Sequence, residues 1–216
     1  MRLDFELASL ADTDSLGAAV APLLEAGDVL ALEGELGSGK TALVRAIAVA
    51  RGVDPALISS PTFVIVNEYP VAGGTPLAHV DAYRLSSRDD LDPLGWDRLG
   101  DGSCVLLVEW AGRIADALPP ERTARLALRA TGEASRHATL DVPESWARRP
   151  GLDALRVLAI PARAPTTCPV TGKPVPSDSL TWPFADERAR MADLYRWFSG
   201  SYNLSRPIEG RDVDEG

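Results

Sequence analysis

Lysine is scarce in this sequence. Of the 22 basic residues among 216, only Lys40 and Lys173 are lysines, and 31 acidic residues give a net charge of −9. Proteins that bind nucleic acid directly usually present a basic patch whose contacts with phosphates release counterions. No run of lysine or arginine forms such a patch here, so direct and tight binding to nucleic acid is not expected.

Cysteine and long apolar runs are also lacking. Two cysteines, Cys104 and Cys168, cannot build a disulfide framework. The first ten residues, MRLDFELASL, alternate apolar and charged side chains without the apolar centre of an export signal, and no stretch approaches the roughly 18 apolar residues of a membrane span. We therefore expect a protein of the reducing cytoplasm that does not insert into membranes.

Apolar segments alternate with amphipathic segments through the first two-thirds of the chain. The expected strands are Leu3–Leu7, Val29–Leu32, Phe63–Tyr69, Leu77–Asp81 and Val105–Val108, with a hairpin of Arg125–Arg129 and His137–Leu140. Expected helices run from a cap at Asp12 or Thr13 to about Glu25, and from about Lys40 to Arg51. Strands alternating with helices, followed by a hairpin, predict an α/β fold with a mainly parallel central sheet and antiparallel additions.

The composition changes at Pro161. Six prolines fall between positions 161 and 183, a density that no regular element tolerates. The sequence therefore predicts two parts, residues 1–160 and residues 161–216. In the second part, Asp186–Phe198 has helical spacing and predicts a small helical extension, and the polar, acidic end after it is expected to be disordered.

The segment GELGSGKT matches the P-loop pattern G-x-x-x-x-G-K-[ST], with an apolar strand before it and an amphipathic helix after it. In such a loop the backbone N–H groups around Gly37, Ser38 and Gly39 converge on phosphate, and the helix N-terminus adds a favourable dipole. Lys40 reaches the outer phosphates, and the Thr41 hydroxyl ligates Mg²⁺. The first part is therefore predicted to be a P-loop NTPase.

A P-loop also needs an acidic side chain at the end of a neighbouring strand to hold the metal, directly or through water. Two residues qualify: Asp81 ends the strand PLAHVD, and Glu109 ends the more apolar strand CVLLVE. In a parallel sheet both ends lie at the same edge as the P-loop. One carboxylate can serve Mg²⁺ while the other activates the attacking water, and strand composition leaves open which does which.

Other polar residues near these motifs give weaker signals. His79 lies inside a predicted strand, where packing is the favoured interpretation. Thr62, in the segment SPTF, either belongs to a turn or senses the γ-phosphate as switch threonines do. Arg113 and Arg136 are candidates for phosphate contacts, with a solvated position as the alternative. No Asn-Lys-x-Asp motif that would read guanine occurs, which argues against a GTPase.

Four segments in this order, GELGSGKT, SSPTFVIVNEYP, HVDAYRL and LLVEWAGRI, closely resemble the TsaE (YjeE) family of bacterial P-loop ATPases, over about residues 3–142. The resemblance implies an ATPase, weak alone and stimulated by partners, that uses ATP and Mg²⁺. It acts with a two-protein tRNA threonylcarbamoyltransferase complex of the TsaD–TsaB type. That complex installs threonylcarbamoyl (t6A) on the adenosine next to the anticodon in tRNAs that read A-starting codons. The partners would hold the tRNA, which agrees with the acidic composition.

The resemblance also assigns roles to individual residues. It implies that Lys40 contacts the phosphates, that Thr41 and Glu109 hold Mg²⁺, and that Asp81 supports hydrolysis. Residues that it places close to the nucleotide or to this edge of the sheet are Thr13, Thr62, Trp110 and Arg136.

The second part resembles short bacterial zinc proteins of the YacG type in CPVTGKPV and in WPFADERARMADLYRWFSGSYNLSRPI. Of the four cysteines in that pattern only Cys168 is present, and Thr171, Ala185 and Ala189 occupy the other positions. One sulfur cannot supply the tetrahedral shell of a structural zinc ion, so no zinc is expected.

Without zinc, so short a segment forms little core of its own. Its helix is therefore expected to dock on the first part or on a partner. The residues expected to make that contact are Trp182, Phe184, Leu194, Trp197 and Phe198. A contact with DNA gyrase, which some YacG-type proteins inhibit, is the less favoured alternative because the metal ligands are missing.

Two functions of other classes remain alternatives for the first part, a small-molecule kinase and a nucleotide-dependent binding module without turnover. A kinase needs a lid and an acceptor pocket, and no arginine-rich lid is visible in the sequence. A kinase releases a phosphorylated acceptor, whereas an ATPase releases inorganic phosphate. In a binding module without turnover, the loss of Asp81 would not change the rate of hydrolysis.

Overall fold

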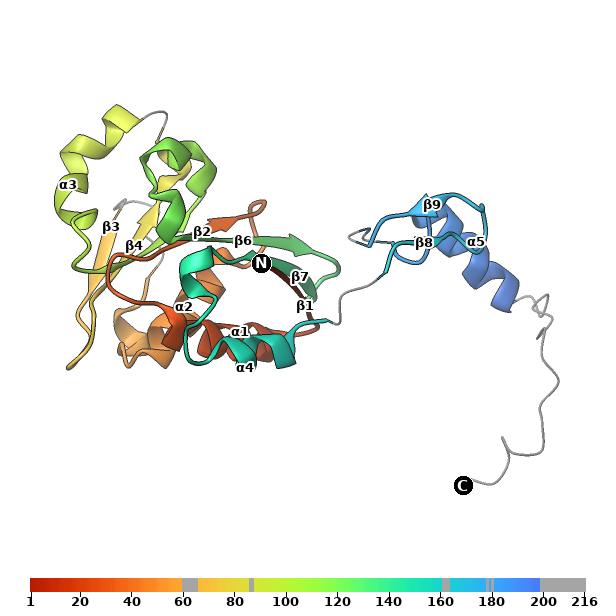
Figure 1. Ribbon diagram of the computed structural model, residues 1–216, viewed down its shortest axis with the longest axis horizontal. Helices are drawn as coiled ribbons and strands as arrows, with labels where there is room; N and C mark the ends of the chain where they lie inside the picture. Colours follow the sequence, from red (N-terminus) through yellow and green to blue (C-terminus); the bar gives the residue numbers. More distant parts are fainter. Residues whose placement is uncertain (60–65, 86–87, 161–163, 178, 180, 199–216) are drawn as a thin grey trace, which may run out of the picture. The chain divides into compact units, whose positions relative to one another are not determined.

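The computed structural model describes residues 1–59, 66–85, 88–160, 164–177, 179 and 181–198 (Figure 1). The chain divides into two units, Met1–Ile160 and Pro161–Gly216.

A seven-stranded sheet organises the first unit, in the order β1-β7-β6-β2-β5-β4-β3. Its strands are β1 (Arg2–Leu7), β2 (Val29–Glu33), β3 (Val66–Tyr69), β4 (Leu77–Asp81), β5 (Val105–Glu109), β6 (Thr123–Ala130) and β7 (Arg136–Asp141). The four central strands, β6, β2, β5 and β4, are parallel, whereas β7, β1 and β3 add antiparallel pairs. The predicted α/β fold, with its mainly parallel centre and late hairpin, is confirmed.

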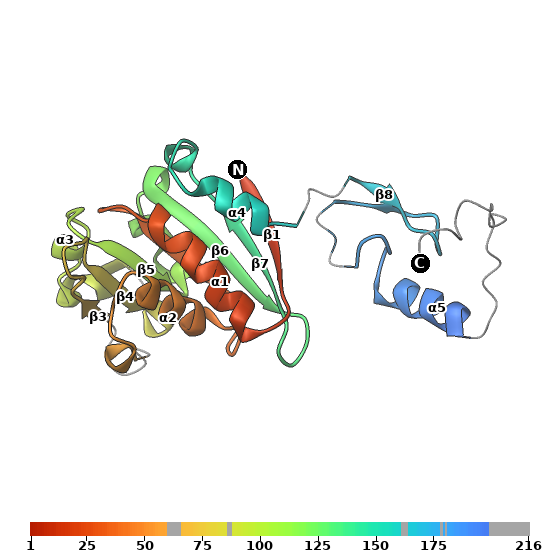
Figure 2. The same ribbon diagram turned by 90° about the horizontal axis from the view of Figure 1, so that it is seen from below.

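Helices cover both faces of this sheet (Figures 1 and 2). One face carries α1 (Leu10–Val20), α2 (Lys40–Ala50) and α4 (Leu152–Leu158), and the other carries α3 (Trp96–Leu99) with 3₁₀ segments at Ala82–Arg84, Arg88–Leu94 and Ala111–Ala117. Strands covered on both sides are apolar throughout, and β2 and β5 follow this rule except for an acidic last residue. No helix in the described parts of the chain combines the length and the apolar character needed to cross a membrane.

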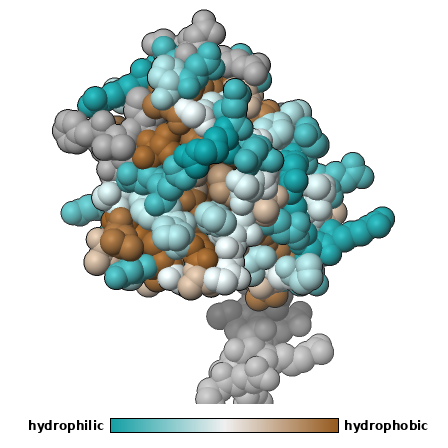
Figure 3. Space-filling model, turned by 90° about the vertical axis from the view of Figure 1, so that its left-hand side faces the viewer, coloured by the Kyte–Doolittle hydropathy of each residue, from teal (hydrophilic) through white to brown (hydrophobic). Residues whose placement is uncertain are grey.

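Two apolar cores result, one on each face of the sheet. The core under α1, α2 and α4 is the larger, and it contains Leu43 and Ile47 of α2 together with Leu30 and Leu32 of β2. The other core lies under α3 and the 3₁₀ segments. Figure 3 shows the end of the molecule that carries α3 and β3, where apolar and polar residues are interspersed over the surface. The larger core fixes α2, and with it the loop before α2, against the central strands.

Helix α1 begins earlier than the sequence predicts. The N-cap is Ser9, whose hydroxyl accepts the N–H of Asp12 at 3.4 Å while the Asp12 carboxylate accepts the N–H of Ser9 at 2.9 Å. This reciprocal capping box satisfies two backbone donors at once, so the expected cap at Asp12 or Thr13 is wrong, and Thr13 is buried inside the helix. The helix gives way to a 3₁₀ turn that contains Pro22, which lacks the N–H that an α-helix requires.

The close packing of α1 on α2 depends on Gly17. A Cβ at this position would lie 2.4 Å from the Cβ of Ala46 and 3.1 Å from the backbone of Ala46 and Ile47. Both helices are anchored in the larger core, so they cannot separate without disturbing it.

The second unit contains a short hairpin of β8 (Thr166–Thr167) and β9 (Pro174–Val175), followed by α5 (Glu187–Phe198). Cys168, Val175 and Ala189 form a small buried core, and Trp182 and Phe184 are among the residues packed against it. These two partly buried aromatic side chains therefore contribute to the unit's own core, and the expectation that they also make a docking contact stays a prediction. The Leu194 side chain is exposed. The side chains of Trp197 and Phe198 lie outside the described set, as do residues 199–216, where disorder was expected.

The turn between β8 and β9 surrounds the sulfur of Cys168. The N–H of Thr171 points at Sγ over 3.4 Å, and the N–H of Gly172 donates to the Cys168 carbonyl at 2.9 Å. Burial raises the pKa of the Cys168 thiol, but hydrogen bonds from the Thr171 side chain and from backbone N–H groups, those of Ala185 and Thr171 first, lower it to about 7. Positions 171, 185 and 189, where the zinc proteins carry cysteine, thus gather around Cys168. In the described parts of the chain no three His, Cys, Asp or Glu side chains form a metal-binding group.

We predict that Gly17→Ala lowers the free energy of unfolding by about 1–3 kcal/mol, because the added methyl group overpacks a contact that cannot widen. Urea denaturation measures this loss. Ala18→Ser, at an exposed position of the same helix, should change the stability by less than about 0.5 kcal/mol. Equal stabilities of the two variants would show that the helices separate freely.

The arrangement around Cys168 predicts that a metal site can be restored. The triple variant Thr171→Cys, Ala185→Cys, Ala189→Cys should retain about one Zn²⁺ per chain after dialysis, because four thiolates complete a tetrahedral shell. Elemental analysis measures the metal, with Thr171→Cys alone as the control that should lose it. A triple variant without zinc would refute the zinc-ribbon interpretation, and one equivalent in the unmodified chain would refute the expectation of no zinc.

Candidate nucleotide-binding site

The P-loop leads from the end of β2 into the first turn of α2, and its first glycine is required by the path of the chain. Gly34 has a φ of +143°, and a Cβ there would lie 2.3 Å from the carbonyl oxygen of Leu128 on β6 and 2.6 Å from Oγ of Ser38. Gly37 and Gly39 also have positive φ. The loop therefore has the backbone conformation that the motif predicts.

Lys40, the first residue of α2, is only 4% exposed. Its ammonium group donates to the carbonyl oxygens of Gly34 at 2.8 Å and Glu35 at 3.0 Å. It also lies 4.0 Å from the centroid of the Trp110 ring, within cation–π distance. The lysine is thus held at the loop by backbone carbonyls on one side and an aromatic ring on the other.

Three carboxylates act on this ammonium group. Burial lowers the pKa of Lys40, and the negative charges of Glu109, Asp81 and Glu33 oppose that effect. These acids end β5, β4 and β2, so the carboxyl ends of three parallel strands converge on one lysine. The sequence singled out two of the three, and the signal for Glu33 was its position at the end of the strand before the P-loop.

Thr41 and Glu109 are joined directly. Oγ1 of Thr41 donates to Oε1 of Glu109 over 2.8 Å, which links the first turn of α2 to the end of β5. Mg²⁺ prefers hard oxygen ligands and commonly takes one or two from the protein while keeping several waters. Thr41, which the P-loop pattern assigns to the metal, and Glu109, which the family resemblance assigns to it, therefore fit a Mg²⁺ site.

His79 on β4 also contacts Glu109. Its Nε2 lies 2.9 Å from Oε1 of Glu109, and the histidine side chain is fully buried. The interpretation of His79 as packing alone is therefore incomplete. Periodicity gave no signal for this contact, because it depends on how β4 and β5 are aligned.

Asp81 stands beside Glu109, because the last residues of β4 and β5 are partners in the parallel register. Oδ1 of Asp81 accepts the N–H of Tyr83 at 3.0 Å, which holds the carboxylate at the strand end. The structure thus brings both acids to the edge that carries the P-loop. Glu109 bonds to Thr41, and Asp81 makes no such bond within the described residues, so the geometry favours Glu109 for the metal.

Trp110, Tyr83 and Arg113 form a series of contacts beside Lys40. Trp110 has a φ of +58°, which is rare outside glycine, and its N–H donates to the carbonyl of Leu32 at 3.0 Å. The Trp110 and Tyr83 ring centroids are 5.0 Å apart, and the Arg113 guanidinium lies 5.7 Å from the Tyr83 ring. The sequence did not single out Tyr83, although an aromatic residue two positions after Asp81 is a signal that could have been used.

Arg136 is the first residue of β7, and its guanidinium group donates hydrogen bonds to the backbone of the P-loop. Its Nε donates to the carbonyl of Ser38 at 3.0 Å and its Nη2 to that of Gly37 at 3.3 Å, while Nη1 bonds to carbonyls of the β6–β7 turn. Thr13 is buried in α1, and no hydrogen bond in the described parts of the chain connects its side chain to the loop. Thr62 lies outside the described residues.

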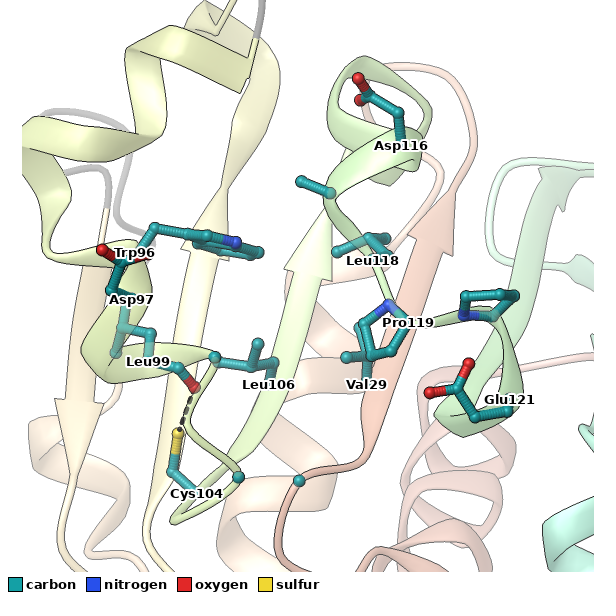
Figure 4. A pocket seen from close by; sticks show the side chains of 15 residues that line it. Val29, Trp96, Asp97, Leu99, Cys104, Leu106, Asp116, Leu118, Pro119 and Glu121 are labelled. Carbon is teal, nitrogen blue, oxygen red and sulfur yellow. Dashed lines mark hydrogen bonds between the residues drawn. The ribbon is translucent and has the colours of Figure 1, made fainter.

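A pocket of about 490 Å³ lies near the amino ends of the parallel strands, away from the P-loop at their carboxyl ends (Figure 4). Its lining includes Val29 and Leu106 of the sheet, Trp96 and Leu99 of α3, Leu118 and Pro119, and the acidic residues Asp97, Asp116 and Glu121. Because β2 begins at this pocket and ends at the P-loop, the pocket cannot supply an acceptor for a phosphoryl group held there. It gives the kinase alternative no support.

The chain is similar to proteins of one family. The family model described as threonylcarbamoyl adenosine biosynthesis protein TsaE matches residues 7–138. The TsaE protein of Streptomyces coelicolor is 43% identical over 139 residues, which cover 61% of this chain and 92% of that protein. The TsaE protein of Treponema pallidum is 37% identical over 132 residues, or 61% and 95% of the two chains. The crystal structure of Bacillus subtilis YdiB superposes with a TM-score of 0.57 at 31% identity, covering 73% of this chain and 95% of that one.

We predict that Arg136→Ala weakens ATP binding about tenfold, because losing hydrogen bonds from a charged donor releases the P-loop backbone. Isothermal titration calorimetry measures the dissociation constant. The control is Arg129→Ala, at an exposed position of β6 in the same hairpin, which should bind ATP as the unmodified protein does. An unchanged dissociation constant for Arg136→Ala would mean that these hydrogen bonds do not order the loop.

Proposed function

Because this chain belongs to the TsaE family of threonylcarbamoyl adenosine biosynthesis proteins, we propose that it is the ATPase subunit of that pathway. Its turnover of ATP is required for threonylcarbamoyl modification of the adenosine next to the anticodon in tRNAs that read A-starting codons. The observation that carries the proposal is the hydrogen bond from Thr41 to Glu109 at the P-loop, with Asp81 beside it. A P-loop with this set of side chains has the parts that nucleotide hydrolysis needs.

In the proposed reaction each residue has a separate task. Lys40 exchanges its bonds to the Gly34 and Glu35 carbonyls for phosphate oxygens, which moves its charge to where negative charge develops. Thr41 and Glu109 would hold Mg²⁺, which would supply positive charge to offset that of the phosphates. Asp81 accepts a proton from the attacking water or orients it.

Partners complete the proposed activity. The low lysine content and the charge of −9 argue against direct binding of tRNA, so we assign tRNA binding to a two-protein complex of the TsaD–TsaB type. ATP hydrolysis on this subunit resets that complex between cycles and is weak without it. The two free, buried thiols, Cys104 and Cys168, are consistent with the cytoplasm as the place of action.

For the second unit the proposed role is docking through its helix α5. Its helix α5 exposes Met191, Leu194 and Tyr195, with 75% of Tyr195 accessible. An apolar stripe of this kind on a small unit is stabilised by a partner surface.

The test is multiple-turnover modification of tRNA by the partner complex with ATP. We expect modification to require this protein, and Asp81→Ala to bind ATP but release less than about 1% of the inorganic phosphate. Lys40→Ala should support no modification. Multiple turnover without this protein would refute the proposed role, normal phosphate release by Asp81→Ala would refute the role of that carboxylate, and a phosphorylated small molecule among the products would favour a kinase.

A further inference from the structure

His79 occupies a fully buried position on the central strand β4. Its neighbours Ala78 and Val80 belong to the core under α3, whereas Leu77 belongs to the core under α2. Side chains alternate along a strand, so His79 faces the same side as α2 and the P-loop. An apolar side chain would pack at this position without the desolvation that an imidazole suffers. Packing alone therefore does not account for a histidine here.

Among the residues that the structure describes, the imidazole ring makes one hydrogen bond, and that bond goes to Glu109. A carboxylate accepts but does not donate, so Nε2 of His79 carries the proton in its 2.9 Å contact with Oε1 of Glu109. Nδ1 is buried and has no hydrogen-bond partner in the described parts of the chain. Buried polar atoms are usually paired. The ring thus leaves one nitrogen unsatisfied while the other contacts the carboxylate.

Glu109 receives donors from two different elements. Thr41 donates from α2 at 2.8 Å and His79 from β4 at 2.9 Å, both to Oε1, and only 5% of the Glu109 side chain is exposed. No donor in the described residues contacts Oε2. Two donors on one oxygen fix the rotation of the carboxylate and leave the other oxygen free.

We propose that His79 is a positioning residue for the metal site, which holds the Glu109 carboxylate in the orientation that binds Mg²⁺. The inference rests on the proposed function, since it concerns the metal used with ATP. Replacing a residue that orients a metal ligand in this way typically lowers the metal affinity 10–100-fold. The sequence segment HVD thereby contributes two residues to the site, Asp81 at the strand end and His79 behind the metal ligand.

The experiment replaces the donor while keeping the volume. His79→Leu should weaken the binding of Mn²⁺ to the ADP-loaded protein about tenfold or more, measured from the electron paramagnetic resonance signal of free Mn²⁺. ADP binding in EDTA should stay within about twofold of the unmodified protein, because the P-loop contacts do not involve His79. His79→Gln, whose amide N–H reaches near the position of Nε2, should recover most of the metal affinity. His137→Leu, at the chain's other histidine on β7, is the matched control and should bind both ligands normally.

A folded His79→Leu variant with unchanged Mn²⁺ affinity would overturn the inference. Equal loss of ADP binding with and without metal would also overturn it, because that pattern describes a structural defect. If His79→Leu does not fold, His79→Gln and His79→Asn decide, since asparagine is too short to reach Glu109 from the Nε2 position. Equal metal affinities in those two variants would then refute the inference. If the unmodified protein binds ADP equally well with and without a metal ion, both the role of His79 and the proposed function are refuted. If its ADP binding depends on the metal but it supports no tRNA modification, only the proposed function is refuted.

Discussion

The hydrogen bond between Thr41 and Glu109 is the contact on which the geometry of the site depends. It joins residues that are 68 positions apart, and it forms because β2 and β5 are parallel neighbours with Leu32 paired to Glu109. The strand that leads into the P-loop and the strand that ends in the acid therefore finish side by side. The larger core presses α2 against the same strands, so the hydroxyl at the start of that helix meets the carboxylate without a flexible connection. Any change in strand order would separate them.

One buried lysine and three acidic residues lie at the edge of the sheet that carries the P-loop. Lys40 is the single lysine of residues 1–160, and it is buried where Glu33, Asp81 and Glu109 end three neighbouring strands. Burial of an ammonium group is costly unless it is paired and hydrogen-bonded. Here the three acids supply negative charge nearby, loop carbonyls supply the hydrogen bonds, and the face of Trp110 adds a further contact. The same groups can exchange with phosphates and a metal ion, which makes the site stable on its own and receptive to a charged ligand.

The second unit is short and is stabilised around a single cysteine, Cys168. Its hairpin and helix are arranged around one buried sulfur, that of Cys168, with Thr171, Ala185 and Ala189 close to it. Backbone N–H groups and the Thr171 side chain bond to that sulfur, and Trp182 and Phe184 cover it. Hydrogen bonds to the sulfur and a small apolar core thus stabilise this short unit. Exposed apolar residues on α5 remain available for a surface outside the unit.

The sequence by itself determined the parts of this protein that follow from local patterns. Glycine spacing determined the P-loop, apolar periods determined the strands and α2, and acidic residues after apolar runs marked Asp81 and Glu109. The tertiary structure decided which side chains meet. It moved the cap of α1 to Ser9, placed Arg136 against the backbone of the loop, and added Tyr83 to the wall beside Lys40. It also turned His79 from a packing residue into a partner of Glu109, 30 positions away. Such a contact depends on strand register and side-chain orientation, which are properties of the assembled sheet, whereas hydrophobic periodicity encodes only the face on which a residue lies.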